Sequence, residues 1–169
     1  FRSLESTLKT HEEAGRTVTL LANDQGVLAL FAVADTIKDT SRQAIAELKA
    51  LGVTSIMLTG DNAATAKTIA AQAGIDEARG NLLPEHKLDA IKDLQRLHGL
   101  TAMTGDGIND APALAQSNIG FAMGGAGTDT AMEAADVVVM NDDLRRIPET
   151  IRLSKLTHAI LWQNISLAL

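Results

Sequence analysis

The segment Thr101–Ala111 constrains the fold of this chain more than any other part of the sequence. Its apolar start, together with Leu100, predicts a short buried strand that ends at Met103. Three oxygen-bearing side chains follow within five positions, namely Asp106, Asn109 and Asp110. Gly105 and Gly107 flank the first carboxylate and allow a sharp turn without a Cβ clash. Such a turn is typical of parallel α/β sheets, whose ligands bind at the carboxyl ends of the strands.

The polar cluster after this strand has two interpretations when it is taken alone. A hard cation such as Mg²⁺ binds carboxylate oxygens and usually a substrate phosphate as well. A glycine turn followed by an Asn or Asp helix cap would have the same composition. The other motifs of the chain therefore have to decide between a ligand site and a capped turn.

Composition limits the function classes. A chain of 169 residues suffices for one domain, or for one domain with fragments of its neighbours. Apolar residues make up 46% and aromatic residues only 2%, which favours an aliphatic core of helices packed on a parallel sheet. The net charge is −6 without a basic stretch, so we expect no nucleic-acid partner. The absence of Cys excludes disulfides, thiolate metal sites and thiol nucleophiles.

The first third of the chain predicts a helix followed by a hairpin. Apolar residues at helical spacing run from Phe1 to about Gly15. Two strand-like runs, Arg16–Ala22 and Val27–Val33, are joined by a turn rich in Asn, Asp and Gly. Because a helix and a hairpin are too small to form a domain alone, we interpret them as the remnant of another domain.

From Asp35 onward the pattern predicts alternating helices and strands. The predicted helices cover residues 40–51, 63–73, 84–97, 111–116, 128–134 and 142–169, and the predicted strands cover 53–58, 100–103, 118–123 and 136–140. This alternation is typical of an α/β fold with a doubly wound, Rossmann-like, mostly parallel sheet. The last helix turns apolar over Ala159–Leu169, whereas a membrane-spanning helix needs about 20 apolar residues.

Two strand ends carry the same kind of loop, Thr59-Gly60-Asp61-Asn62 and Thr104-Gly105-Asp106-Gly107. In each loop a hydroxyl and a glycine amide lie between a strand and the amino end of a helix. Backbone N–H groups and the helix dipole both favour an anion at such a place. A single loop of this kind is usually a capped turn, but two in neighbouring strand–helix units favour phosphate binding.

Lys87 follows Pro84 near the start of its predicted helix, where a cation opposes the helix dipole. A nearby phosphoryl group would explain this placement, and a solvated surface lysine is the alternative. The four histidines lack metal-ligand spacing and are expected on the surface; they are His11, His86, His98 and His158. The run Gly124–Gly127 lacks the Lys-Ser/Thr ending of a phosphate loop and predicts a tight turn. Asp35 is a candidate hinge, and a solvated turn carboxylate is the default alternative.

Together these motifs resemble the phosphorylation domain of P-type ATPases, members of the haloacid dehalogenase superfamily. The resemblance rests on three motifs: Thr59-Gly-Asp-Asn62, Pro84-x-x-Lys87 and Met103-Thr-Gly-Asp-Gly-Ile-Asn-Asp-Ala-Pro-Ala-Leu114. Their order and spacing agree with the family from about Asp35 to Met140. The residues around Asn141–Pro148 and Leu161–Leu169 resemble the heavy-metal branch, and within it zinc, cadmium and lead exporters more than copper exporters.

The resemblance implies a role for each matched residue. Asp106 matches the magnesium-binding aspartate, and Lys87 matches the lysine that neutralises charge on the transferring phosphate. Thr59 and Gly60 match groups that contact phosphoryl oxygens, and Asp61 matches a position facing the nucleotide. The remaining matches complete the surroundings of phosphate and magnesium; they are Asn109, Asp110 and Gly105. The implied cofactors are Mg²⁺ and ATP.

The resemblance also implies a domain organisation and a larger parent protein. Residues 1–33 resemble the end of the nucleotide-binding domain, residues 34–141 the phosphorylation domain, and residues 142–169 a stalk helix entering the membrane. The implied parent is an exporter of divalent heavy-metal cations in the cell (inner or plasma) membrane, with this segment on the cytoplasmic side. The family's nucleophile is an aspartate in an Asp-Lys-Thr-Gly-Thr motif, which this sequence lacks. We therefore expect the chain to begin after that motif and to form no aspartyl-phosphate alone.

Two other interpretations stay open at this point. One is a stand-alone magnesium-dependent phosphatase of the same superfamily, against which the missing nucleophile argues. The other is a catalytically inactive module that binds phosphate or magnesium and regulates a partner.

Overall fold

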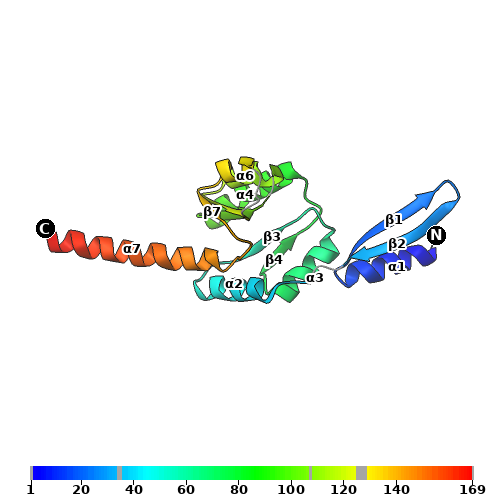
Figure 1. Cartoon of the computed structure of the whole chain (residues 1–169), viewed down its shortest axis with the longest axis horizontal. Helices are drawn as coiled ribbons and strands as arrows, with labels where there is room; N and C mark the ends of the chain where they lie inside the picture. The colour runs from blue at the N-terminus through cyan, green and yellow to red at the C-terminus, as the bar shows by residue number, and fades with distance from the viewer. Residues whose placement is uncertain (1, 34–35, 107, 125–128, 169) are drawn as a thin grey trace.

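Helices and strands alternate along most of the chain in the computed structural model, which describes residues 2–33, 36–106, 108–124 and 129–168. In chain order the elements are α1 (Arg2–Glu13), β1 (Thr17–Asn23), β2 (Gly26–Val33), α2 (Asp39–Ala50), β3 (Ile56–Leu58), α3 (Ala63–Ala73), β4 (Glu77–Arg79), α4 (Pro84–His98), β5 (Ala102–Gly105), the 3₁₀ turn η1 (Ile108–Asp110), α5 (Ala111–Gln116), β6 (Ile119–Met123), α6 (Asp129–Ala134), β7 (Val137–Val139) and α7 (Arg146–Ala168). The β1–β2 hairpin and α7 project from opposite ends of the central α/β part (Figure 1).

The central part contains two parallel sheets, which confirms the predicted α/β class. One sheet pairs β3 with β4, and the other has the order β5-β6-β7. Helix α4 makes the connection from the β3–β4 sheet to the β5-β6-β7 sheet. In doubly wound folds, ligands bind outside the carboxyl ends of the strands. The sequence predicted one sheet, whereas the described strands form two, with β3 and β5 each at a sheet edge.

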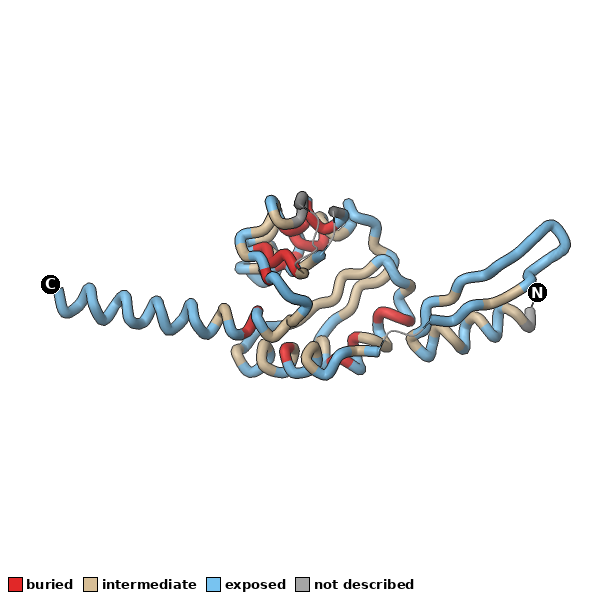
Figure 2. The backbone as a smooth tube through the Cα atoms, viewed as in Figure 1, coloured by how far each residue is buried: buried red, intermediate tan, exposed pale blue. Residues whose placement is uncertain are grey.

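The core of the central part consists of two buried clusters of mostly aliphatic side chains. One buried cluster contains Ile91, Met103, Ala113 and Leu114, and a second contains Phe121, Met123, Val139 and Ile147. Leu58 of β3 packs against the first cluster, which places β3 beside the core of the β5 sheet. Figure 2 shows that the buried backbone is concentrated in the central part of the molecule.

The amino-terminal helix and hairpin form a small unit that contacts α3 through the end of α1. The hydroxyls of Thr65 and Thr68 donate to the carbonyls at the end of α1, at 3.5 Å and 3.3 Å. The pairing of β1 with β2 puts Leu21, Phe31 and Val33 on one face, where each side chain is exposed. Large apolar side chains grouped on one exposed face are typical of a surface that contacts another part of a protein.

The base of α7 packs on the central part, and the rest of α7 extends away from it. Ile147 is buried at this base, and Arg152 donates to Glu47 of α2 at 2.7 Å. Beyond Arg152 the helix is exposed along its length (Figure 2). Trp162 donates to His158 at 3.0 Å, and the two rings meet edge to face. Within the described residues, no helix combines the length and apolarity needed to cross a bilayer.

Several predicted boundaries are wrong, for reasons that the hydrogen bonds explain. The strand predicted from Val53 starts at Ile56, because the carboxylate of Asp76 binds both the backbone N–H and the hydroxyl of Ser55. The helix predicted from residue 142 starts at Arg146, because Asp143 accepts hydrogen bonds from Arg145 in a turn before the helix. The three-residue strand β4 was not predicted, since its sequence is largely charged. Asp35, Gly107 and most of Gly124–Gly127 lie outside the described residues.

We predict that Leu114→Ala destabilises the chain by about 2–5 kcal/mol, because it leaves a cavity in the core. The Leu114 side chain has 0% exposure and joins α5 to α4 and β5. The matched control is Leu156→Ala on α7, where the side chain is 59% exposed and the same truncation should change little. Denaturant unfolding of both variants measures the difference, and equal midpoints would contradict this account of the core.

We predict that the carboxyl of Asp143 titrates with a pKa of about 2, below its ordinary value of 3.8, because the Arg145 side chain and backbone donate to it. A lowered pKa means that this interaction stabilises the fold above the ordinary pKa and is lost as the pH falls toward 2. In NMR titrations, Arg145→Gln should move the pKa of Asp143 back toward 3.8, and Arg96→Gln should leave it unchanged. A wild-type pKa near 3.8 would refute the interaction.

Candidate functional site

An ion pair between Lys87 and Asp110 joins the crossover helix α4 to the loop after β5. The Lys87 ammonium donates to the Asp110 carboxylate at 2.7 Å, and the two side chains are only 17% and 12% exposed. The alternative of a solvated surface lysine is therefore wrong. A largely buried pair of this kind is costly to break from one side, because the remaining charge loses its partner in a poorly solvated place.

Gly105 allows Asp110 to come this close to the end of β5. A Cβ at Gly105 would lie 2.7 Å from both the Cβ and Oδ2 of Asp110, a distance that no side chain tolerates. Asp110 ends the 3₁₀ turn and directly precedes α5, so the backbone reverses over a few residues here. The predicted glycine turn thus has a steric cause: it makes room for the carboxylate that holds Lys87.

The loop after β3 is ordered by its own side chains. The Thr59 hydroxyl accepts from the backbone N–H of Asp61 and donates to the Asp61 carboxylate, each at 3.1 Å. Asn62 caps α3 by accepting from the N–H of Thr65 at 2.9 Å. Gly60 and Asp61 are exposed at the amino end of this helix. The capped turn that the sequence allowed is present, and it leaves a polar, solvent-facing loop.

The segment between β4 and α4 connects the β3 loop to Lys87. The N–H of Asn81 donates to the carbonyl of Asp61 at 2.6 Å, and the N–H of Leu82 donates to the carbonyl of Thr59 at 3.0 Å. Gly80 is packed so tightly that a Cβ would lie 2.8 Å from the Asp61 carbonyl. The two predicted loops, at the ends of β3 and β5, are therefore linked through this segment and through Lys87.

Asp106 and Asn109 lie at the end of β5 with exposed side chains. In the described part of the chain, no group of three or more His, Asp or Glu side chains could enclose a metal ion. One exposed carboxylate nevertheless suits Mg²⁺, which keeps several waters and completes its shell with substrate phosphate rather than with a protein cage. The donor set fits a magnesium ion that arrives with a phosphate ligand, and Asp106 is the residue that would hold it.

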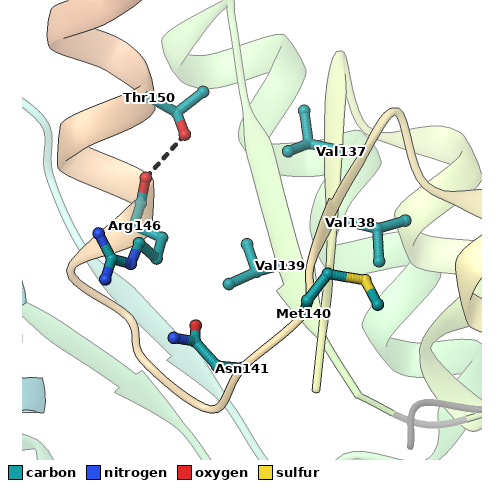
Figure 3. A pocket seen from close by; sticks show the side chains of 7 residues that line it. All are labelled: Val137, Val138, Val139, Met140, Asn141, Arg146 and Thr150. Atoms are coloured by element: carbon teal, nitrogen blue, oxygen red, sulfur yellow. Dashed lines mark hydrogen bonds between the residues drawn. The ribbon is translucent and has the colours of Figure 1, made fainter. Parts of the chain in front are cut away.

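A separate shallow cavity of about 340 Å³ lies between β7 and the start of α7. Its lining comes from β7, the following loop and the first turns of α7 (Figure 3): Val137, Val138, Val139, Met140, Asn141, Arg146 and Thr150. None of the predicted site residues lines it. The candidate site is therefore an open edge at the strand ends and not this cavity.

The sequence missed one residue of the site region. His86 was predicted to be an ordinary surface side chain, and it is exposed, but its Nδ1 accepts from the backbone N–H of Leu83 at 3.3 Å. Leu83 is the N-cap of α4, and position N3 is where a capping-box side chain reaches back to that residue. The position of His86, three residues after the N-cap, was the available signal.

Chemically, the arrangement presents an anchored ammonium, a hydroxyl, a helix amino end and an exposed carboxylate around one edge. An ammonium and helix-terminal N–H groups bind phosphate, and a carboxylate holds a hard cation. These are the groups that phosphoryl transfer needs, because that reaction depends on positioning and charge neutralisation more than on covalent chemistry by the protein.

We predict that Gly105→Ala separates Lys87 from Asp110 and destabilises the chain by about 1–3 kcal/mol, because the new methyl group overlaps the carboxylate. For comparison, Gly60→Ala adds the same methyl group with a nearest neighbour at 3.5 Å, an ordinary contact, and should cost less. Thermal unfolding gives the stabilities, and the NMR signal of the Lys87 ammonium reports the pair. An intact pair in Gly105→Ala would show that the steric argument is wrong.

The chain is similar in sequence to a known protein family and to individual known proteins. Residues 2–118 match the haloacid dehalogenase-like hydrolase family. The chain is 46% identical over 169 residues to a probable cadmium-transporting ATPase of Alkalihalophilus pseudofirmus, covering 99% of this chain and 23% of the relative. It is 50% identical over 167 residues to a copper-exporting P-type ATPase of Bacillus subtilis, covering 99% and 21%. The chain thus spans less than a quarter of the length of these relatives.

The chain is also similar in three-dimensional structure to a solved metal-transporting ATPase. The chain superposes on a zinc-transporting PIB-type ATPase, crystallised in the E2.Pi state, with a TM-score of 0.80 and 43% identity. The match covers 97% of this chain and 27% of that protein.

Proposed function

This chain belongs to the haloacid dehalogenase-like hydrolase family, and from that premise we propose that it supplies the magnesium- and phosphate-binding part of a metal-transporting P-type ATPase. The parent would export divalent heavy-metal cations, using ATP and an aspartyl-phosphate intermediate. The observation that carries this proposal is the buried Lys87–Asp110 pair, joined through the β4–α4 segment to the Thr59 loop. An ammonium fixed in this way, beside two strand ends rich in phosphate-binding groups, suits a transferring phosphoryl group.

Each residue has a role in this proposal. Lys87 neutralises charge on the transferring phosphate, and Asp110 holds Lys87 in place. Thr59, Gly60 and Gly105 surround the phosphoryl oxygens with a hydroxyl and backbone N–H groups, and Asn109 adds an amide. Asp61 faces the nucleotide. Asp106 holds Mg²⁺, which supplies charge neutralisation on the phosphates when it is bound.

The phosphate acceptor would come from a strand that is not among the residues of this chain. The sequence contains no Asp-Lys-Thr-Gly-Thr motif. In the described structure β3 and β5 are edge strands of two separate sheets, so each has a side open to a further strand. A parallel strand inserted there would join the two sheets and place a carboxylate at its carboxyl end, beside Thr59 and Lys87. Because the acceptor carboxylate would come from another segment, this arrangement favours a part of a larger phosphoryl-transferring transporter over a self-sufficient phosphatase.

The same proposal assigns the flanking parts. Residues 1–33 would close a nucleotide-binding domain, whose remainder covers the apolar face formed by Leu21, Phe31 and Val33. Residues 34–141 form the phosphorylation domain. Residues 142–169 form a stalk, and Trp162 with the exposed apolar residues around it suits a membrane interface, where tryptophan is enriched. The parent would lie in the cell membrane with this segment on the cytoplasmic side.

The cargo in this proposal is a divalent heavy-metal ion of the zinc and cadmium group. Support comes from the residues around Asn141–Pro148 and Leu161–Leu169, which resemble that branch. Relatives named for cadmium and a structure named for zinc stand beside others named for copper. Transport by the intact protein is the measurement that separates these cations.

We predict that Asp106→Ala lowers phosphoprotein formation from ATP in the intact transporter on the order of 100-fold, because a magnesium-binding carboxylate is lost. Asp89→Ala on the exposed side of α4 is the control and should leave labelling unchanged. Acid-quenched labelling with γ-labelled ATP measures both. Normal labelling in Asp106→Ala would mean that this residue does not hold the ion.

We also predict that the 169-residue chain alone forms no acid-stable phosphoprotein and hydrolyses no phosphomonoester in the presence of Mg²⁺, because the acceptor carboxylate is supplied by another segment. A stand-alone phosphatase would release phosphate from a substrate such as p-nitrophenyl phosphate. Release that is lost in Asp106→Ala would overturn the proposal in favour of that activity.

A further inference from the structure

Three consecutive backbone N–H groups form a strap between the β3 loop and α4. Asn81 donates to the carbonyl of Asp61, Leu82 to the carbonyl of Thr59, and Leu83 to the Nδ1 of His86. We call residues Asn81–Leu83 the strap. Its first two bonds hold the loop after β3, and its third holds the first turn of α4. The strap therefore sets where one loop lies relative to the other.

Leu83 is bound at both of its backbone groups by consecutive residues of α4. Its N–H donates to the imidazole of His86, and its carbonyl accepts from the N–H of Lys87 at 3.2 Å. Leu83 is also the N-cap of the helix, yet its side chain has no acceptor for the first helical N–H groups. The imidazole of His86 is therefore the side chain that closes this helix end.

The backbone of the strap is in a conformation that the surroundings have to maintain. Asn81 has a φ of 57°, the left-handed region that residues other than glycine rarely adopt. The preceding Gly80 is pressed against Ala63 and the Asp61 carbonyl. Strained backbone persists when neighbouring contacts determine it, and it is concentrated at functional sites. In the strap, the left-handed backbone of Asn81 is held by the close contacts of Gly80. The strap ends one helical turn before Lys87.

We infer that His86 is a positioning residue for Lys87: its imidazole accepts from the backbone N–H of Leu83 and so fixes the first turn of α4 relative to the Thr59 loop. This inference rests on the proposed function, because it concerns the distance between two phosphate-binding groups of one site. His86 itself touches neither the phosphate nor the magnesium ion. Its effect passes through Leu83 to the backbone of Lys87.

The consequence for catalysis follows from geometry. Lys87 is in the first turn of α4, and Asp110 anchors only the end of its side chain. If the N-cap of the helix frays, the Lys87 backbone moves, and the ammonium then takes another position beside Asp110, at a different distance from the Thr59 loop. Displacements of about 1 Å in a phosphoryl-transfer site are enough to lower rates.

The test uses four variants of the intact transporter and measures the rate of phosphorylation from ATP. His86→Ala should slow phosphorylation about three- to tenfold, by loss of a capping acceptor. His86→Gln should restore the rate to within about twofold, because glutamine accepts at the same capping-box position. His98→Ala, at the last residue of the same helix, is the matched control and should have no effect. Lys87→Ala tests the proposed function itself.

The outcomes separate the two ideas. A normal rate in Lys87→Ala would overturn the proposed function, and the inference with it. A slow Lys87→Ala with a normal His86→Ala would overturn only the role of His86. Equal losses in His86→Ala and His86→Gln, or a loss in His98→Ala, would also overturn it, because the effect would then not depend on an acceptor at this position. In the 169-residue chain, amide exchange at Leu83 should be faster in His86→Ala and restored in His86→Gln.

Discussion

The ion pair between Lys87 and Asp110 is the interaction on which the site depends. It joins a helix that follows β4 to a loop that follows β5, and so it crosses between the two parallel sheets. Gly105 makes room for the carboxylate, and the strap holds the helix end that carries the ammonium. A methyl group at Gly105 would separate the two charges, which is costly because each would lose its partner in a poorly solvated place, whereas loss of the strap would shift the helix end that carries Lys87. The chain therefore maintains this pair with steric fit on one side and hydrogen bonds on the other.

The pair also explains why two small sheets can act as one scaffold. In the described structure β3 is bonded to β4 and β5 to β6. The contacts between these two parts include Leu58 on the first core cluster, Leu48 on the second, and the Lys87 region. A doubly wound fold binds its ligand at the carboxyl ends of its strands, and here the ends of β3 and β5 carry the two polar loops. In our proposal the acceptor strand inserts between β3 and β5. In that proposal, the open edges of β3 and β5 receive the acceptor strand, and the loops that follow β3 and β5 bind the phosphate beside it.

Much of this could be predicted from the sequence, because the relevant signals are local. The hairpin turn at Asn23–Gly26, the Asn62 cap and the Pro84 start each act within a few residues, and the structure confirms the elements they mark. The position of Lys87 against the helix dipole suggested a phosphoryl partner, which stays a prediction, and the structure pairs Lys87 with the carboxylate of Asp110. Local signals did not identify that partner, since Asp110 is 23 residues away.

What the sequence did not predict depends on contacts between distant segments. The late starts of β3 and α7 are decided by the hydrogen bonds between Asp76 and Ser55 and between Asp143 and Arg145, which have no periodicity. The division into two sheets depends on how strands distant in sequence pair. The strap was missed for a similar reason. Its donors are backbone groups, and only the folded loops bring their acceptors within reach.

The most direct test of the central claim is to identify the phosphorylated residue in the intact transporter after labelling from ATP. Proteolysis and mass spectrometry of the acid-quenched protein would locate the acyl phosphate. Our account predicts an aspartyl-phosphate in a segment outside these 169 residues, and it predicts that the label disappears when Lys87 is replaced. A phosphorylated residue within the 169-residue chain, or full labelling without Lys87, would contradict the account.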